Sequence, residues 1–406
     1  MAAKSPAAAV LPRLLLCSLL GMPLSAADWP GWRGPMRTGV STETDLNWAW
    51  GAAGPKVLWK ASAGKGFSSF AVAAGRAYSL GNRDDVDTVF CWDAETGREL
   101  WRHSYPCALD PLSYEGGPSA TPAVDGDRVY TLSKSGHAFC LEAGSGKVIW
   151  TRTFAAPERT KEDYRVWWGF AGSPLVLADR LVLAVGTAGT ALDKLTGKTL
   201  WESGSGRPGY SSPVPFTQGQ QACLALASGH EVVAVDTQTG QVLWRLPWRT
   251  TWDQDAADVI VAGGRLLVSS GHGVGGALFD VTSVPPAQLW RNTDLRNEIG
   301  SSVLWQGHVY GYDFRQLRCL DWENGRVVWA APESSLGTVM VADGKVIALE
   351  QTGRLVVFEA TAAACKPLAQ AQTLGGRCWS APALAAGRLF VRNATGDVVC
   401  LDLRRP

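Results

Sequence analysis

The side chains best suited to chemistry or recognition gather in five segments that combine aromatic and charged residues. These segments are 114–117, 162–168, 207–210, 249–258 and 291–298. The candidate partner-binding residues within them are Tyr114, Glu115, Arg165, Trp167, Trp168, Arg207, Tyr210, Trp252, Asp253, Asp255, Asp258, Arg291, Asn292, Arg296 and Asn297. Aromatic and charged side chains converging on one rim suit recognition of a peptide, a glycan or a small ligand. The alternative is that these segments only form a solvated surface, and the sequence leaves both interpretations open.

The sequence lacks the common catalytic and metal-binding motifs. Its five histidines are scattered without the spacing of metal ligands, and it contains neither a nucleophile elbow nor a phosphate-binding loop. Asp253, Asp255 and Asp258 could gather a cation, but a calcium ion normally takes about six to eight oxygen ligands. The glycine-rich run 270–276 precedes no predicted helix, so we interpret it as a hairpin. We therefore predict no catalytic residue and no metal site.

The charge balance excludes partners that are recognised by electrostatics alone. The formal net charge is +1, and removal of the first 27 residues would take away Lys4 and Arg13 and no acid. Neither value supports binding to nucleic acid or to an anionic membrane.

One nine-residue phrase, Asp-x-x-Thr-Gly-x-x-x-Trp, recurs along the chain and organises it. Clear copies occupy residues 93–101, 142–150, 193–201, 236–244 and 321–329, and a fainter copy runs from 280 to 290. The residues to which we assign a structural role are Asp93, Gly97, Trp101, Gly146, Trp150, Asp193, Gly197, Trp201, Asp236, Gly240, Trp244, Asp321, Gly325 and Trp329, together with Trp59. Counted from Trp59, the tryptophans lie 39 to 51 residues apart. Self-similarity at this period indicates a propeller or a solenoid.

Each copy of the phrase is typical of a hairpin between two strands. The Asp and Thr side chains can bond to the backbone across the turn, and Gly supplies the positive φ of a short loop. The Trp that follows can cover the seam between neighbouring units with its large apolar face.

A second recurring turn, upstream of each hairpin, gives the number of units. It is found at Gly75, Gly126, Asp179, Gly219, Gly264, Gly307, Gly344 and Gly387. Each of the eight units therefore holds four short strands. The last unit reaches Asp402 without a Trp strand, and residues 56–59 can supply one. We predict an all-β fold over residues 56–406: an eight-bladed β-propeller of four-stranded antiparallel blades, closed by an N-terminal strand.

The first 55 residues precede the propeller and divide into two parts. Residues 1–27 carry two basic residues, a short apolar stretch and Ser25-Ala-Ala27, which is the pattern of a secretory signal peptide. The stretch is too short for a membrane anchor, and Cys17 lacks a lipoprotein context, so we expect a periplasmic or secreted protein. Residues 28–55 are rich in Trp, Gly and Pro. We expect them to form an arm packed on the ring, with its Trp residues buried and its Arg residues near the surface.

The nine cysteines fit structural positions better than a disulfide framework. Four of them, Cys91, Cys140, Cys319 and Cys400, stand two residues before a hairpin acid in different units. Equivalent positions in different blades lie too far apart for a disulfide, so we predict buried thiols. Cys365 and Cys378 are the one pair worth testing, and the sequence does not settle whether they are joined.

The repeated phrase resembles the tryptophan-docking repeat of pyrroloquinoline quinone (PQQ) dehydrogenases. The chain length and the closing strand are more similar to the PQQ-like propellers that bind no quinone, of which the BamB-like proteins are an example. Five shorter runs resemble those of a bacterial subfamily of exported PQQ-binding-like repeat proteins, namely 29–35, 291–292, 301–305, 319–322 and 376–379.

The resemblance implies two functions of different kinds. The quinone enzymes hold a Ca²⁺ or lanthanide ion through Glu, Asn and Asp beside the quinone, use a catalytic Asp and often carry a vicinal disulfide. None of these can be carried over residue by residue, and no haem motif is present. We therefore expect a non-enzymatic, monomeric binding protein that needs no cofactor, inserts in no membrane, and holds a protein or polymer on one propeller face. The alternative is an oxidoreductase dependent on PQQ and Ca²⁺.

Overall fold

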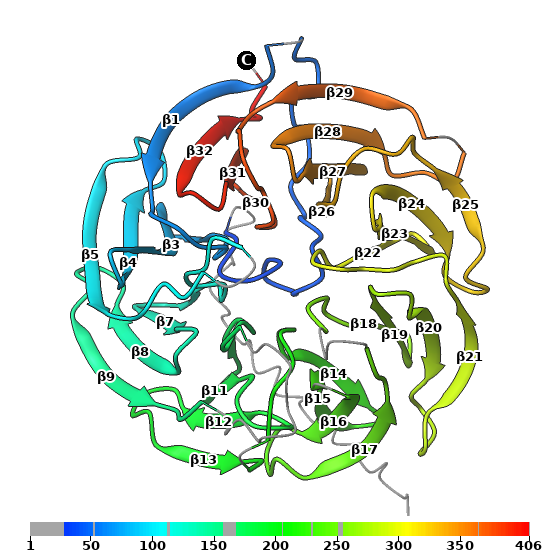
Figure 1. Cartoon of the computed structure of the whole chain (residues 1–406), viewed down its shortest axis with the longest axis horizontal. Coiled ribbons are helices and arrows are strands. Elements are labelled where there is room, and N and C mark those ends of the chain that lie inside the picture. The colour runs from blue at the N-terminus through cyan, green and yellow to red at the C-terminus, as the bar shows by residue number, and fades with distance from the viewer. Residues whose placement is uncertain are drawn as a thin grey trace, which may run out of the picture.

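The chain forms a closed ring of β-sheets around a central axis. The computed structural model describes residues 28–51, 53–111, 114–156, 168–204, 206–228, 230–250, 255–363 and 365–405. Within these residues there are eight sheets, each of four antiparallel strands, and they follow one another round the ring in chain order (Figure 1). The predicted eight-bladed propeller is confirmed. The described residues form no helix long and apolar enough to cross a membrane.

The blades are numbered here from the first complete sheet. Blade 1 consists of β2 (Ala71–Ala73), β3 (Arg76–Arg83), β4 (Val86–Asp93) and β5 (Glu99–Pro106), and blade 2 of β6 (Ala123–Asp125), β7 (Arg128–Leu132), β8 (His137–Glu142) and β9 (Val148–Thr153). Blade 3 consists of β10 (Leu175–Val176), β11 (Arg180–Leu183), β12 (Thr190–Asp193) and β13 (Thr199–Glu202). Blade 4 consists of β14 (Val214–Gln218), β15 (Gln221–Ser228), β16 (Glu231–Asp236) and β17 (Val242–Pro247). Blade 5 consists of β18 (Ile260–Ala262), β19 (Arg265–Ser270), β20 (Gly275–Asp280) and β21 (Ala287–Asn292), and blade 6 of β22 (Val303–Trp305), β23 (His308–Asp313), β24 (Gln316–Asp321) and β25 (Val327–Ala330). Blade 7 consists of β26 (Gly337–Ala342), β27 (Lys345–Glu350), β28 (Arg354–Glu359) and β29 (Pro367–Gln372). Blade 8 consists of β30 (Ala383–Ala385), β31 (Arg388–Arg392) and β32 (Asp397–Asp402), together with β1 (Lys56–Ser62) from the start of the ring.

Five of the repeated tryptophans pack on the hairpin glycine of the next blade. A Cβ atom added to Gly240 would lie 2.5 Å from the Trp201 ring. The Trp201 Nε1 also donates a hydrogen bond to the Thr237 carbonyl at 3.0 Å. The same packing joins Trp59 to Gly97, Trp101 to Gly146, Trp150 to Gly197 and Trp290 to Gly325. The tryptophans therefore do cover the seams between blades, and the glycine is required for space as well as for its positive φ.

The hairpin before each of these tryptophans is held by its acid. In blade 3, the Asp193 Oδ1 accepts hydrogen bonds from the Thr196 backbone at 2.7 Å and from the Thr196 hydroxyl at 2.7 Å. These bonds lower the pKa of Asp193 below its ordinary value. The hairpin of blade 5 differs, because Pro285 and Pro286 stand where the other copies have glycine. Trp244 accordingly donates to Gln218 of its own blade.

The ring closes where β1 pairs with β32, as the sequence predicted. The two strands are antiparallel, with Lys56 opposite Asp402 and Trp59 opposite Cys400. Arg392 of β31 adds a second connection across this closure and is fully buried. Its guanidinium donates to acceptors in blade 1 and in the loop before it, which are the carbonyls of Gly64, Ser68 and Leu80 and the hydroxyl of Ser79. Blade 8 is thus connected to blade 1 by the hydrogen bonds of Arg392, in addition to the pairing of β32 with β1.

The cysteines are core residues. Cys91, Cys140, Cys319 and Cys400 are completely buried, and each lies opposite the tryptophan of its blade across the strand pair. All eight cysteines of the described residues are free thiols. Cys365 and Cys378 belong to different hydrophobic clusters, so they do not pair.

The N-terminal arm enters the centre of the ring. From its start beside β2 it turns at the axis and leaves between blades 7 and 8, where it continues into β1 (Figure 1). Trp29 is buried as predicted, but the expectation that the arginines lie near the surface was wrong. Arg33 and Arg37 are 5% and 8% exposed. They are buried because the channel offers backbone carbonyls at the starts of the inner strands, and both guanidinium groups donate to them.

The glycine contact between blades can be measured by substitution. Gly240→Ala should lower the free energy of unfolding by about 3 kcal/mol, because the methyl group would overlap Trp201 in addition to straining a positive φ. Gly126→Ala is the matched control, since Gly126 also has a positive φ (57°) but nothing lies within 4 Å of its added Cβ. We expect about 1 kcal/mol for the control in urea unfolding. Equal losses for the two variants would contradict the packing role.

The ring closure can be tested at Arg392. Arg392→Met should destabilise the protein by about 3 kcal/mol or more, because it leaves several buried carbonyl groups without a donor. The exposed Arg326→Met serves as the control. Thermal unfolding monitored by circular dichroism distinguishes them, and a melting temperature for Arg392→Met equal to that of the control would refute the proposed connection.

Candidate functional site

A collar of hydrogen bonds extends round the channel at the starts of the inner strands of six blades. In each case the backbone N–H of one blade donates to the side-chain oxygen at the equivalent position of the next blade. The residues of the collar, from blade 1 to blade 6, are Ser69, Thr121, Ser173, Ser212, Asp258 and Ser301, and the distances are 2.7–3.0 Å. The collar fixes the positions from which the preceding loops extend over the channel mouth.

Asp258 is the one carboxylate in this collar, at a place where the other blades carry a hydroxyl group. Its Oδ1 accepts the Ser212 N–H, and its Oδ2 accepts the Trp32 indole N–H at 2.5 Å. Arg33 Nε lies 3.9 Å from the same Oδ2. Asp258 therefore holds the N-terminal arm inside the channel, and its carboxylate forms an ion pair with Arg33.

A cavity of about 280 Å³ lies above the arm, on the face formed by the loops that connect the blades. Its lining residues are Trp32, Phe67, Tyr114, Ser119, Trp168, Ala171, Ser173, Tyr210, Ser212, Ala256, Asp258, Glu298, Ile299 and Trp379. Four of the predicted residues, Tyr114, Trp168, Tyr210 and Asp258, come together here. Loops from seven blades and the arm contribute to the lining, so the cavity exists only when the ring is closed.

Five aromatic rings form a continuous arc along one side of the cavity. The rings, each from the loop before a different inner strand, are Trp379, Phe67, Tyr114, Trp168 and Tyr210. Neighbouring centroids along the arc are 5.2–6.1 Å apart, which is the range of favourable aromatic pairs. The loops of blades 8, 1, 2, 3 and 4 thus build one aromatic wall. We call these five residues the aromatic arc.

The opposite side of the cavity is acidic. Asp258 and Glu298 are its ionisable carboxylates, and the described lining contains no Lys, Arg or His. Among the described residues, none forms a hydrogen bond or an ion pair with the partly buried Glu298 carboxylate. The cavity therefore combines an apolar, electron-rich wall with a carboxylate that has no partner within the described structure.

The other candidates from the loops of blades 1 to 5 have different positions. Glu115 forms an ion pair with Arg377 at 2.9 Å beside the aromatic arc, and Arg207 is partly buried in the loop of Tyr210. Asp255 is buried behind the cavity, where its Oδ1 accepts the Ser270 hydroxyl at 2.9 Å. Arg165, Trp167, Trp252 and Asp253 lie outside the described residues.

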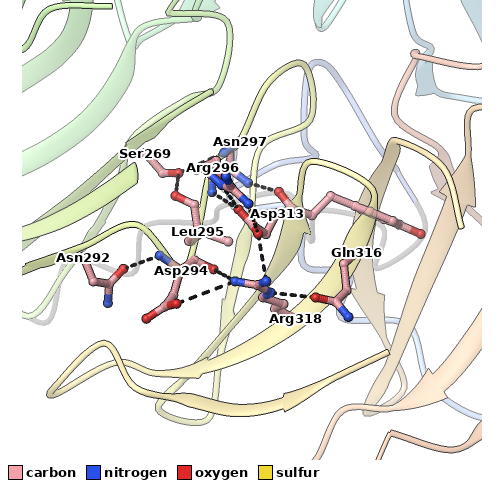
Figure 2. Close-up of polar contacts among 10 residues, drawn as sticks. Ser269, Asn292, Asp294, Leu295, Arg296, Asn297, Asp313, Gln316 and Arg318 are labelled. Atoms are coloured by element: carbon pink, nitrogen blue, oxygen red, sulfur yellow. Dashed lines mark hydrogen bonds and ion pairs between the residues drawn. The ribbon is translucent and has the colours of Figure 1, made fainter. Parts of the chain in front are cut away.

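The candidates near the end of blade 5 take part in an internal polar network (Figure 2). Arg296 binds the buried Asp313 carboxylate through Nε and a terminal nitrogen at 2.7 and 2.8 Å. Asn297 donates to the Tyr312 carbonyl and Asn292 to the Gly325 carbonyl. Arg291 stacks on the Trp248 ring at 4.8 Å. Asn292, Arg296 and Asn297 thus connect the end of blade 5 with blade 6, whereas Arg291 contacts a ring that follows blade 4. None of these four residues is part of the described cavity lining.

Among the aromatic and charged lining residues, the sequence interpretation did not select four, namely Trp32, Phe67, Glu298 and Trp379. Phe67 and Trp379 each stand directly before a serine at the start of an inner strand, as Tyr210 does. An alignment of the units on this aromatic-serine pair would have found them, because the loops that carry them are short and were not selected for length or charge.

The described acids do not form a metal site. Asp255 and Asp258 bind different partners, and no group of three or more His, Cys, Asp or Glu side chains suited to a metal ion occurs among the described residues. The third member of the predicted aspartate group, Asp253, lies outside them.

Comparison with known proteins identifies a family. The family described as outer membrane protein assembly factor BamB matches residues 49–109, 109–331 and 280–405. BamB of Yersinia pestis is 23% identical over 351 residues, which cover 84% of this chain and 77% of that protein.

Enzymes of related fold also match. A polyvinylalcohol dehydrogenase of a Pseudomonas species is 30% identical over 155 residues, which cover 33% of this chain and 23% of the enzyme. The structure of a europium-containing methanol dehydrogenase superposes with a TM-score of 0.73 at 12% identity, covering 92% of this chain and 91% of that one. A likeness at this identity establishes the fold alone.

The burial of Asp255 should make stability depend on pH. Desolvation raises the pKa of Asp255 to about 7, whereas an unfolded chain ionises Asp near 3.9. Between about pH 4 and about pH 7 the unfolded state binds fewer protons than the folded state. The free energy of unfolding therefore falls by up to roughly 4 kcal/mol as the pH rises through this range. Asp255→Asn removes this contribution. The variant should gain in melting temperature over wild type at pH 8 and show little gain at pH 4.5, while the exposed Asp127→Asn should show neither effect.

Proposed function

The chain belongs to the family described as outer membrane protein assembly factor BamB, and from this premise we propose that it is an exported, non-enzymatic binding protein. The proposed site is the loop-rich face, which would hold a protein or polymer partner. The aromatic arc carries the proposal, because five rings lining an open cavity form an apolar site that a partner can fill.

The arm supports this choice of face. It closes the channel from the side of the inner hairpins, where Asp343 accepts the Leu46 N–H and Glu43 accepts the Gly387 N–H. A partner can therefore reach the aromatic arc only from the side of the connecting loops. Those loops are also where one blade differs from the next, whereas the hairpins on the other face repeat the same phrase.

The second candidate, a PQQ-dependent oxidoreductase, is favoured by the partial matches to a quinoprotein ethanol dehydrogenase and a quinohemoprotein alcohol dehydrogenase of Pseudomonas putida. The residues around the cavity do not fit this cofactor. PQQ is a tricarboxylate, whereas the described lining has two carboxylates and no cationic side chain to neutralise it. The described residues also lack an acidic group suited to the accompanying ion.

Site-specific photocrosslinking in the native host tests the binding face. A photoreactive residue would replace Ile299 or Glu333 on the loop-rich face, or Glu142 or Glu323 in the hairpins of the opposite face. Crosslinked adducts should form from the first two positions, and adducts from the hairpin positions alone would overturn the proposal.

Titration with PQQ, with and without Ca²⁺, distinguishes the second candidate. We expect no saturable change in tryptophan fluorescence. Saturable quenching together with reduction of an electron-accepting dye by alcohols would favour the oxidoreductase instead.

A further inference from the structure

We propose that the cavity binds an organic cation, an ammonium or guanidinium group that belongs to the partner. The inference rests on the proposed function for the location of the site, and it adds the chemistry that the site recognises. It follows from the charge of the lining, from the aromatic arc and from the size of the cavity.

The charge of the described lining favours a cation. A carboxylate that is partly withdrawn from water loses hydration, and this loss is offset when a cation or a hydrogen-bond donor pairs with it. Asp258 already has Trp32 and Arg33. Glu298 has no such partner among the described residues, and no basic residue of the described lining competes with a bound cation. The described lining is therefore complementary to positive charge.

The aromatic arc, which lies opposite the acidic side, also favours a cation. Aromatic rings attract a cation placed over their faces, with about 0.5–2 kcal/mol for each contact depending on desolvation. The protein itself uses this interaction at the end of the arc, where the Arg377 guanidinium lies 4.5 Å from the centre of the Trp379 ring. A cation inside the cavity would meet both Glu298 and several rings.

The size of the cavity limits the ligand to a small group. A cavity of about 280 Å³ is at the lower end for small-molecule sites and admits a side chain or a head group, not a folded segment. The cation could belong to an arginine or lysine side chain of a protein, or to a choline-like head group of a polymer or lipid. The chemistry is shared, so the probes must distinguish the two sources.

Isothermal titration calorimetry of the full chain with matched probe pairs tests the inference. One pair is N-acetyl-arginine amide and the uncharged N-acetyl-citrulline amide. The other is choline and dimethylbutanol, in which carbon replaces the ammonium nitrogen. In at least one pair the cation should bind about tenfold or more tightly than its neutral counterpart. Preference for arginine would identify a protein side chain, and preference for choline a head group. Equal or absent binding of both members in both pairs would overturn the inference.

Two variants assign the preference to the cavity. Glu298→Gln should abolish most of the discrimination between cation and neutral probe, and Trp168→Leu should weaken cation binding severalfold. Glu333→Gln makes the same charge change on an exposed side chain of the same face and should leave binding unchanged. Unaltered melting temperatures would show that the fold is intact. Discrimination that survives Glu298→Gln would refute the assignment.

The outcomes remain separate from those of the crosslinking experiment. If adducts form from the loop-rich face but no cation is preferred, the proposed function stands and the inference falls. If adducts form only from the hairpin face, the proposed function falls, and cation binding then describes a separate small-molecule site.

Discussion

The contact between a tryptophan of one blade and the hairpin glycine of the next is the constraint on which this structure depends. A four-stranded blade is small and cannot bury both of its faces alone. The indole covers one seam, and its Nε1 donates to a carbonyl of the adjoining hairpin, so that packing and hydrogen bonding fix the same geometry. Because this contact sets how one blade sits on the next, it also determines that the ring closes and that the loops converge over the channel.

The N-terminal arm lies in the channel of the ring and forms part of the cavity wall. Without it the axis would be an open passage, whereas Arg33 and Arg37 hold the arm through carbonyls from blades 3 and 6. Burial lowers the pKa of Arg37 to about 10, so its guanidinium stays charged at neutral pH and can keep these bonds. Trp32 then forms part of the cavity wall, and Asp258 connects the arm to the collar.

The fold could be predicted from the sequence because its defining contacts repeat at fixed positions. Because the last unit reaches Asp402 without a Trp strand, residues 56–59 could be predicted as the strand that closes the ring. The arm was predicted less well, since the burial of Arg33 depends on carbonyls that are more than 250 positions away in the chain. The site was predicted in part. Tyr114, Trp168 and Tyr210 were chosen by residue type and location, and they line the cavity. Arg296 was chosen for the same reasons, but its carboxylate partner Asp313 sits in a strand of the next blade, which residue type alone cannot reveal.

The pairing of β1 with β32 has a consequence for the biogenesis of the protein. The first strand to leave the ribosome has its partner in the last, so the apolar seam at Trp59 stays without its neighbour until synthesis of the ring is complete. Closing so long a loop costs entropy that only the finished blade can offset. The ring therefore stays open until β32 has been made, and docking of β1 on β32 is the step that completes it.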